Sequence, residues 1–285
     1  MNMRALVVGA GGQLGETMRD RFSARHDVVP VTRQELDVTS PDAVAALVAH
    51  VRPTVIVNCS AYTNVDGAED QPVQALAVNA MAVRLLARAA DTVQATLVHY
   101  STDFVFDGVT DRPYTEDDAP NPRGTYAMSK LLGEWFAAEA ARHYVLRVES
   151  LFGGARARSS VDRILDTIRS GAPVRAFADR AVSPSYVEDV VTATETLLRT
   201  GAPHGLYHCV NSGWTNWAEL SRELARLAGR PDAVVEETKM SDAKLRAPRP
   251  LFAALANEKL ARAGVVMPTW QDAMARYVKS LKAEG

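Results

Sequence analysis

The sequence predicts an α/β fold with a doubly wound parallel sheet and a smaller C-terminal lobe. Short apolar runs alternate with longer periodic segments as far as about Val148, and a glycine-rich turn follows the first run. Beyond Leu151, shorter elements are separated by stretches rich in Gly, Ser and Pro. Regular alternation of strand and helix implies right-handed crossovers and helices on both faces of a parallel sheet. We therefore expect residues 1–150, with returning segments from the C-terminal half, to form the sheet domain, and residues 151–285 mainly the lobe.

Each predicted strand is a short β-branched or apolar run, and each predicted helix is a longer segment of helical period. Ser40 and Pro41 mark one helix start clearly, because serine caps a helix and proline fits its first turn. The lobe would cover the carboxyl ends of the strands, where open α/β sheets bind ligands. In chain order we expect strand 4–8, helix 14–25, strand 27–31, helix 40–51, strand 54–58, helix 73–90, strand 95–101, a helix from Thr125, and strand 143–148.

Composition narrows the functional classes. The 285 residues are 47% hydrophobic and 23% charged, with a formal net charge of -2. This balance gives no reason to expect nucleic acid, whose phosphates require a basic surface. The apolar runs are too short for a signal segment or a membrane span, so we expect a cytoplasmic protein without a membrane partner. Cys59 and Cys209 are expected to be free thiols, and the six histidines show no zinc-ligand spacing.

The glycine-rich turn has the form of a phosphate-binding loop. Gly9, Gly12 and Gly15 follow the first predicted strand and lead directly into its helix. Glycine permits the tight turn and the close approach of backbone N–H groups, while the helix N-terminus contributes partial positive charge. An ordinary strand-to-helix turn is the alternative. The position after the first strand favours dinucleotide binding in a Rossmann-type domain.

The end of the second strand indicates which dinucleotide is bound. An acidic residue that grips the adenosine ribose is expected there, but the sequence reads Val31-Thr32-Arg33. The Arg33 guanidinium would suit a 2′-phosphate, so NADP(H) is preferred. Arg33 as a solvated loop residue is the alternative, and Glu35 keeps NAD(H) open.

Tyr126 and Lys130 lie four residues apart in a predicted helix and therefore share one face. Taken alone, such a pair is more often a surface pair than a catalytic one. It gains meaning from the glycine turn and from the segment "STDFVFDG", which begins at Ser101.

Taken together, these motifs resemble the extended short-chain dehydrogenase/reductase superfamily and, within it, the dTDP-4-dehydrorhamnose reductase family. The similar stretches run nearly end to end and include "GAGGQLG", "ELDVTSPDAV", "STDFVFDG", "YAMSKLLGE", "VSPSYVEDV" and "RPLFAAL". The most specific are Ala61 to Glu69 and Ser101 to Gly108. The resemblance implies cofactor-binding positions at Gly9, Gly12, Gln13, Leu14 and Gly15 for the pyrophosphate, Asp37 and Val38 for the adenine, Ala61 and Tyr62 lining the cofactor, and Asn79 supporting the geometry.

The resemblance also implies a catalytic triad of Thr102, Tyr126 and Lys130, with Asp103 as a substrate-contacting acid. Reduction of a ketone leaves an alkoxide that needs a proton, and tyrosine suits this role best if its pKa falls from about 10 toward neutrality. Lys130 would supply the charge that lowers it, and would also hold the nicotinamide ribose. Thr102 would hydrogen-bond to the same carbonyl oxygen.

Three rival functions are compatible with the same superfamily or fold. A 4,6-dehydratase needs an Asp-Glu pair after the threonine, but Asp103 is followed by Phe104, so dehydration is disfavoured. A sugar-nucleotide 4-epimerase stays open. A non-catalytic NADP-binding regulatory subunit of the same fold is also open, although Thr102, Tyr126 and Lys130 are all present.

The sequence departs from the family where Arg147-Val148-Glu149-Ser150 replaces Arg-Thr-Ser-Trp. Ser150 removes a flat stacking surface for the sugar, so the sugar would differ, unless Phe152 or Trp214 takes over. Arg249 is either a diphosphate partner or a structural arginine.

Three glutamates, Glu134, Glu139 and Glu195, are expected on solvated helix faces, although an ion-bridged homodimer is an alternative. The resulting hypothesis is an NADP(H)-preferring oxidoreductase of deoxysugar biosynthesis. It would reduce the 4-keto group of a nucleotide-linked, dTDP-type 6-deoxy sugar.

Overall fold

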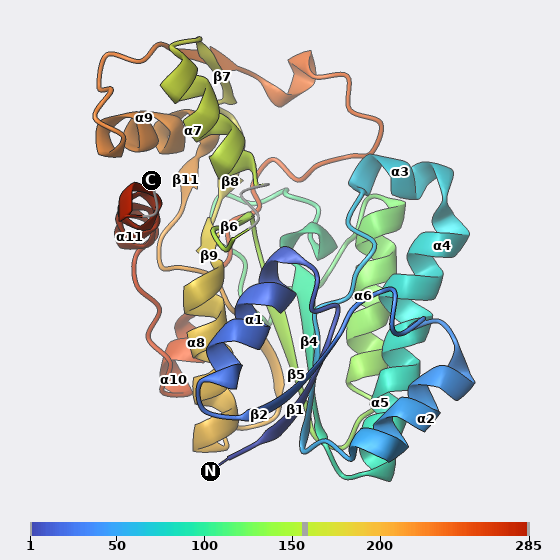
Figure 1. Cartoon of the computed structure of the whole chain (residues 1–285). Coiled ribbons are helices and arrows are strands. Elements are labelled where there is room, and N and C mark those ends of the chain that lie inside the picture. Colours follow the sequence, from blue (N-terminus) through green and yellow to red (C-terminus); the bar gives the residue numbers. More distant parts are fainter. Residues whose placement is uncertain (1, 156–158, 284–285) are drawn as a thin grey trace.

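The computed structural model describes residues 2–155 and 159–283, and it consists of a central parallel sheet, two helical layers and a smaller lobe (Figure 1). The six strands lie in the order β10-β5-β4-β3-β1-β2, and all their pairings are parallel. The order reverses beside β1, which produces the switch point where such sheets bind ligands. The strands are β1 (Arg4–Val8), β2 (Asp27–Val31), β3 (Val55–Asn58), β4 (Thr96–Thr102), β5 (His143–Val148) and β10 (Gly205–His208).

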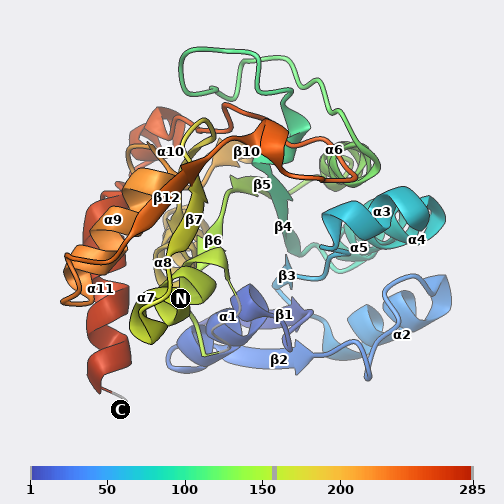
Figure 2. The same ribbon diagram turned by 90° about the horizontal axis from the view of Figure 1, so that it is seen from above.

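The two helical layers cover opposite faces of this sheet, as Figure 2 shows from above. One layer packs α1 (Gln13–Ser23) against α8 (Val187–Thr200), which returns from the C-terminal half. Side chains alternate across β1: Ala5 and Val7 join one core cluster, and Leu6 and Val8 join the other. The second layer contains α2 (Pro41–Val51), α3 (Val65–Asp70), α4 (Pro72–Leu76), a π-helical turn (Ala77–Met81), α5 (Ala82–Thr92) and α6 (Thr125–Ala137).

The lobe lies above the carboxyl ends of the sheet strands in Figure 1. It is built from three strand pairs, β6–β9, β7–β12 and β8–β11. Helix α8 and strand β10 lie after residue 150 but belong to the sheet domain, as returning segments. The division of the chain into two domains at residue 150 stays a prediction. The remaining elements are β6 (Leu151–Phe152), α7 (Ser160–Ser170), β7 (Val174–Phe177), β8 (Ala181–Val182), β9 (Ser185–Tyr186), β11 (Thr215–Asn216), α9 (Trp217–Leu227), β12 (Val235–Thr238), α10 (Glu258–Arg262) and α11 (Trp270–Ala283), with short 3-10 turns at Asp103–Val105 and Met240–Asp242.

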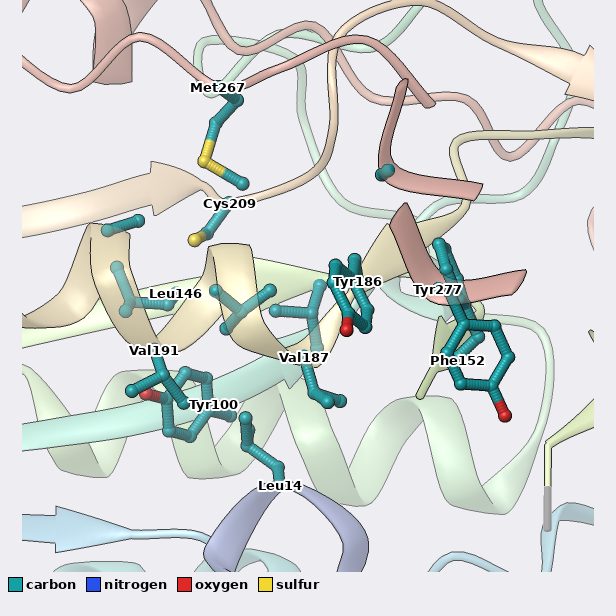
Figure 3. Close-up of a cluster of buried hydrophobic side chains, with 14 of the residues drawn as sticks. Leu14, Tyr100, Leu146, Phe152, Tyr186, Val187, Val191, Cys209, Met267 and Tyr277 are labelled. Carbon is teal, nitrogen blue, oxygen red and sulfur yellow. The ribbon is translucent and has the colours of Figure 1, made fainter. Parts of the chain in front are cut away.

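A continuous apolar core joins the lobe to the sheet (Figure 3). Phe152 is fully buried and stacks on Tyr186 at 5.3 Å between ring centroids, and Tyr277 packs beside both rings. Aromatic side chains contribute large buried areas at such junctions. We expect the lobe to be held firmly over the strand ends.

The predicted helix 73–90 is interrupted in the structure. It is divided into α4, the π-helical turn and α5. In the described part of the chain, the run Pro72–Thr92 is long and apolar enough to pass a membrane-span test, and half of its most apolar window is buried. Because α5 packs between α2 and α6, we interpret this run as a core helix of the second layer.

Candidate active site

A cavity of about 1050 Å³ opens at the carboxyl ends of β1, β2 and β3, at the switch point of the sheet. Its size and position fit an extended ligand such as a dinucleotide. Seven of the predicted cofactor residues line it, namely Gly9, Gly12, Arg33, Asp37, Val38, Ala61 and Tyr62.

The three glycines of the turn have different physical roles. Gly9 has φ +80°, and a Cβ there would lie 2.7 Å from the Ser60 nitrogen. A Cβ on Gly15 would lie 2.2 Å from the Gly9 oxygen, so Gly15 permits the close packing of α1 on β1. A Cβ on Gly12 would meet nothing closer than 3.4 Å, so packing within the protein does not explain this glycine. Close approach of a pyrophosphate does explain it.

The start of α1 fits an anion. Gly12 is its N-cap residue and gives no side-chain cap to the first-turn N–H groups. Gln13 and Leu14 contribute only backbone at this point. The Gln13 amide donates to the Gly153 carbonyl at 2.8 Å, and the Leu14 side chain is buried in the core.

At the tip of β2, the acidic side chains are already bonded to the protein. One Glu35 carboxylate oxygen accepts from the Thr32 backbone N–H at 2.7 Å and from its hydroxyl at 2.8 Å. Asp37 accepts from the Thr39 hydroxyl and N–H, and these bonds lower the pKa of Asp37. Arg33 is exposed on the cavity wall. Among the described residues that line the cavity, Arg33 carries the positive charge that suits a 2′-phosphate.

Asn79 lies in the π-helical turn and holds the cavity loop from behind. Its side chain exchanges hydrogen bonds with the Tyr62 backbone, accepting from the N–H at 2.8 Å and donating to the carbonyl at 3.0 Å, and it also donates to the Ser129 hydroxyl. Asn79 is buried and does not line the cavity. It would position Tyr62 for a cofactor rather than contact one.

The predicted triad converges where β4 ends beside α6. Thr102 is the last residue of β4, while Tyr126 and Lys130 occupy successive turns of α6. Thr102 hydrogen-bonds with the Tyr126 phenol. Lys130 is buried, and its ammonium donates to the Tyr100 carbonyl at 2.5 Å. Burial lowers the pKa of Lys130 to about 8, and the Glu134 carboxylate opposes that effect.

The expected lowering of the Tyr126 pKa is wrong. Burial raises it, and the Asp103 carboxylate raises it further, while the hydrogen bond with Thr102 acts in the opposite direction. The Lys130 charge is directed at the Tyr100 carbonyl instead. A raised pKa keeps the phenol protonated at neutral pH, which is the form that a proton donor requires.

The start of α6 is stabilised by a residue from α3. Gly124, the N-cap of α6, supplies no side-chain cap. Both Glu69 oxygens fill this role, because they accept from the Thr125 N–H at 2.8 Å and from the Thr125 hydroxyl at 2.9 Å. Glu69 thereby fixes the turn that carries Tyr126.

Glu134 was expected on a solvated helix face, and that prediction is wrong. It is 6% exposed and accepts from the Ser101 hydroxyl at 2.5 Å and from Arg147 at 2.8 and 2.7 Å. The residue lies four positions after Lys130, on the same inward face of the helix. This spacing is the signal that could have identified it.

Sequence reasoning overlooked Glu149 and Arg180. Asp103 and Glu149 are each 2% exposed, and the Arg180 guanidinium lies 4.0 Å from the Asp103 carboxylate. Burial raises the pKa of Asp103 to about 6, and Arg180 opposes the shift. Burial and the neighbouring Asp103 charge raise the pKa of Glu149 well above its usual value. The site thus contains an acidic pair beside Tyr126.

The remaining substrate candidates lie around this pair. Ser150 has φ +45°, a strained left-handed backbone for a non-glycine residue, and its carbonyl accepts from Ser185 of β9. Arg249 pairs with Asp66 of α3 at 3.0 Å and lies 5.8 Å from the Phe104 ring centroid. It therefore has a structural partner already.

The two aromatics considered as replacements for the missing tryptophan differ. Phe152 is fully buried in the junction core, so it cannot stack on a sugar there. Trp214 is 49% exposed and packs on Phe252. Of the two aromatic residues, Trp214 is therefore the one with a ring surface exposed for stacking on a sugar.

The two cysteines also differ, because Cys209 is buried and Cys59 lines the cavity. Burial raises the pKa of both thiols to about 12. Within the described residues, no group of three or more His, Cys, Asp or Glu side chains is arranged to hold a metal ion.

Comparison with known proteins identifies the family of this chain. The family model described as the RmlD substrate binding domain matches residues 3–283. A dTDP-4-dehydrorhamnose reductase of Mycolicibacterium smegmatis is 33% identical over 99% of this chain and 86% of its own length. A probable dTDP-4,6-dihydroxy-2-methyloxan-3-one 4-ketoreductase of Streptomyces antibioticus is 34% identical over 95% of this chain and 93% of its own. Among solved structures, a Bacillus anthracis dTDP-4-dehydrorhamnose reductase in complex with NADP gives a TM-score of 0.93 at 30% identity, and covers 98% of this chain and 100% of its own.

Proposed function

This chain belongs to the RmlD substrate binding domain family, and from that membership we propose that it is an NAD(P)H-dependent oxidoreductase that reduces the 4-keto group of a dTDP-linked 6-deoxy sugar. NADPH is the preferred cofactor, and NADH is the weaker alternative. The observation that carries the proposal is the pairing of Thr102 with Tyr126 where β4 ends beside α6, with Lys130 one turn further along and next to Cys59, which lines the dinucleotide-sized cavity.

The chain's own residues divide the reaction between them. Bound NADPH supplies the hydride for C4 of the sugar. The Thr102 hydroxyl orients the C4 oxygen, and the protonated Tyr126 phenol gives that oxygen a proton as negative charge develops on it. The Lys130 ammonium would hold the nicotinamide ribose, as the resemblance to the family implies.

Cofactor preference follows from the tip of β2. One carboxylate oxygen of Glu35 is held by Thr32 and one of Asp37 by Thr39, so each carboxylate is directed toward the protein's own loop. Arg33 remains for a 2′-phosphate, which a guanidinium binds through charge-assisted hydrogen bonds.

We assign the sugar to the space bounded by Asp103, Ser150 and the lobe. Serine in place of a tryptophan leaves room beside the ring, and Trp214 offers an exposed indole at the lobe. Arg249 is paired with Asp66. To bind a diphosphate, its guanidinium would leave the Asp66 carboxylate and pair with the phosphate oxygens. The sugar is therefore expected to differ from the rhamnose precursor in its configuration or its substituents.

The rival functions lose ground for specific reasons. A regulatory subunit needs no triad, whereas Thr102, Tyr126 and Lys130 are together here. An epimerase must also reoxidise the sugar, and the two curated relatives compared above carry reductase names. A homodimer and a cytoplasmic location stay predictions, to be checked by sedimentation and by cell fractionation.

The test is NADPH oxidation with a panel of dTDP-4-keto-6-deoxyhexoses. Tyr126→Phe should reduce turnover by at least about a hundredfold, because a positioned proton donor contributes about 10² to 10⁴ to the rate. The affinity for NADPH should change less than about threefold, because the phenol oxygen is not needed for binding. A mutant with near-normal rate would reject Tyr126 as the acid. A wild-type protein that turns over no sugar nucleotide would reject the enzyme assignment.

A further inference from the structure

The ends of β4 and β5 place two acidic side chains next to each other. Thr102 and Val148 are register partners in these neighbouring strands, so the next residues, Asp103 and Glu149, leave the sheet side by side. Paired strands lie about 4.8 Å apart. Both side chains are 2% exposed, so the carboxyl groups lie in a site without ready access to water.

Each carboxyl group has hydrogen-bond partners on only one of its two oxygens. Asp103 Oδ1 accepts from the Thr102 hydroxyl at 2.8 Å, and Glu149 Oε2 accepts from the Ser183 N–H at 2.6 Å. Within the described residues, Asp103 Oδ2, Glu149 Oε1 and Arg180 Nε are buried without a hydrogen-bond partner. Unsatisfied buried polar atoms of this kind are rare in folded proteins.

The charges around the pair indicate that it retains a proton. Among the residues that the structure describes, the groups that act on it are Arg180, from the loop between β7 and β8, and Tyr126 of α6, in addition to the effect of the Asp103 charge on Glu149. One guanidinium cannot neutralise two carboxylates, and two carboxylates that share a dry site do not both ionise readily. Burial raises the pKa of Asp103 to about 6, and burial together with the Asp103 charge raises the pKa of Glu149 well above its usual value. Both shifts favour a pair that retains one proton between its two carboxyl groups.

A path of neighbouring groups connects this proton to the catalytic tyrosine. Glu149 adjoins Asp103 with one unpaired oxygen on each carboxyl group, Asp103 accepts from the Thr102 hydroxyl at 2.8 Å, and Thr102 is a hydrogen-bond partner of the Tyr126 phenol. The hydroxyl of Thr102 can both donate and accept a proton. It is therefore able to pass one between its two neighbours.

We propose that Asp103 and Glu149 form an internal acid that returns a proton to Tyr126 through Thr102 after each reduction. The inference rests on the proposed function. Tyr126 gives its proton to the C4 alkoxide and becomes a phenolate. The Thr102 hydroxyl proton then moves to the phenolate, Asp103 gives a proton to the Thr102 oxygen, and Glu149 gives its proton to Asp103.

The net transfer is one proton from the carboxyl pair to the phenolate. The pair is left doubly ionised and takes a proton from solvent when product leaves. Transfer from a carboxylic acid to a phenolate is downhill, because the pKa of Tyr126 is raised above its ordinary value while that of Asp103 is about 6.

The test compares the first turnover with later ones in Glu149→Gln. NADPH is mixed with enzyme and a dTDP-4-keto-6-deoxyhexose, and its absorbance is followed in a stopped-flow instrument. The first equivalent should be oxidised at the wild-type rate, because Tyr126 starts protonated. Steady-state kcat at pH 8 should then be roughly a hundredfold lower, as expected for loss of a positioned acid.

The pH profile separates a proton relay from a structural defect. In Glu149→Gln, Asp103 is the remaining carboxyl group of the pair, and with a pKa of about 6 it carries a proton only under acidic conditions. The kcat of Glu149→Gln should therefore rise steadily as pH is lowered from 8 to 5, while a packing defect would lower activity equally at every pH.

Glu116→Gln is the matched control. The Glu116 carboxyl also accepts one backbone N–H bond, from His208 at 2.8 Å, and burial also raises its pKa, but it takes no part in the path. Its kcat should match the wild type, with no burst. Asp103→Asn breaks the path at its centre and should also show a burst, even if Glu149→Gln folds poorly.

The outcomes are distinguishable. A wild-type kcat for Glu149→Gln at pH 8, or a first turnover as slow as the later ones, overturns the relay and leaves the proposed function intact. A wild-type protein that oxidises no NADPH with any dTDP-sugar overturns the proposed function, and the relay with it.

Discussion

Glu69→Ala tests whether the start of α6 controls catalysis. Glu69 accepts from the Thr125 N–H and hydroxyl at 2.8 and 2.9 Å and is the side-chain cap of a helix whose own N-cap is Gly124. Loss of such a cap costs about 1 kcal/mol, and loss of a negative charge at a helix N-terminus costs about 0.3–1 kcal/mol more. The free energy of unfolding should fall by about 1–2 kcal/mol.

Tyr126 follows Thr125 in the same first turn, so fraying there displaces the phenol. The free energy that the Glu69 cap contributes to this turn also keeps the phenol in place. Its loss should lower kcat by up to about tenfold, because about 1.4 kcal/mol corresponds to a factor of ten. The melting temperature should fall by about 2–6 °C in a chain of this size. NADPH oxidation and differential scanning fluorimetry measure the two effects on the same samples.

Asn216→Ala is the control for a cap remote from the site. Asn216 caps α9 in the lobe by accepting from the Glu219 N–H at 2.8 Å. Its loss should cost about 1 kcal/mol of stability, with kcat kept within about twofold of the wild type. A Glu69→Ala enzyme with lowered melting temperature and unchanged kcat would refute the reasoning, because Tyr126 would then be held by tertiary packing alone.

Three further predictions concern the cofactor site. The Gly12→Ala variant should fold with an unchanged melting temperature but bind NADPH at least about tenfold more weakly. The Gly15→Ala variant should lose stability, because its Cβ would lie 2.2 Å from the Gly9 oxygen. Equal melting temperatures of the two variants, measured by fluorimetry, would contradict this difference. The Arg33→Ala variant should bind NADPH about tenfold more weakly, as expected for loss of charge-assisted bonds, and NADH with little change. An unchanged ratio of the two Kd values would show that Arg33 does not contact the 2′-phosphate. The pKa of Lys130 is about 8, so the ammonium persists below that pH and is lost above it; kcat/KM should fall as pH rises beyond about 8, and a flat profile to pH 10 would show that the charge is not needed.

Local patterns were sufficient to predict much of the fold. The first strand and the strand before Glu149 have the predicted bounds, 4–8 and 143–148. The π-helical turn inside the predicted helix 73–90 was missed, because one widened turn barely disturbs an apolar period. Its cause is tertiary: a Cβ at Gly133 would lie 2.1 Å from the Asn79 carbonyl, so α6 and this turn approach very closely.

The positions of site residues were predictable where the period of a helix or strand places them. The pKa values of these residues were not predictable, because they depend on burial. The triad and the glycine turn follow from sequence spacing. The pKa of Tyr126 does not, because it depends on burial and on Asp103. Glu149 entered the sequence reading only through its neighbour Ser150, and the register of β4 with β5 was needed to place it beside Asp103.

The buried pair of Glu134 and Arg147 explains how α6 keeps its catalytic face in place. Tyr126, Lys130 and Glu134 are spaced four residues apart and lie on one face of α6. Glu69 holds the first turn of the helix through Thr125. Arg147 and the Ser101 hydroxyl hold the third turn through Glu134. Such a pair gains little net stability, because desolvation offsets its attraction. Its effect is on the site, since the Glu134 charge opposes the lowering of the Lys130 pKa by burial. The pair therefore acts as an orienting and electrostatic element of the site more than as a source of stability.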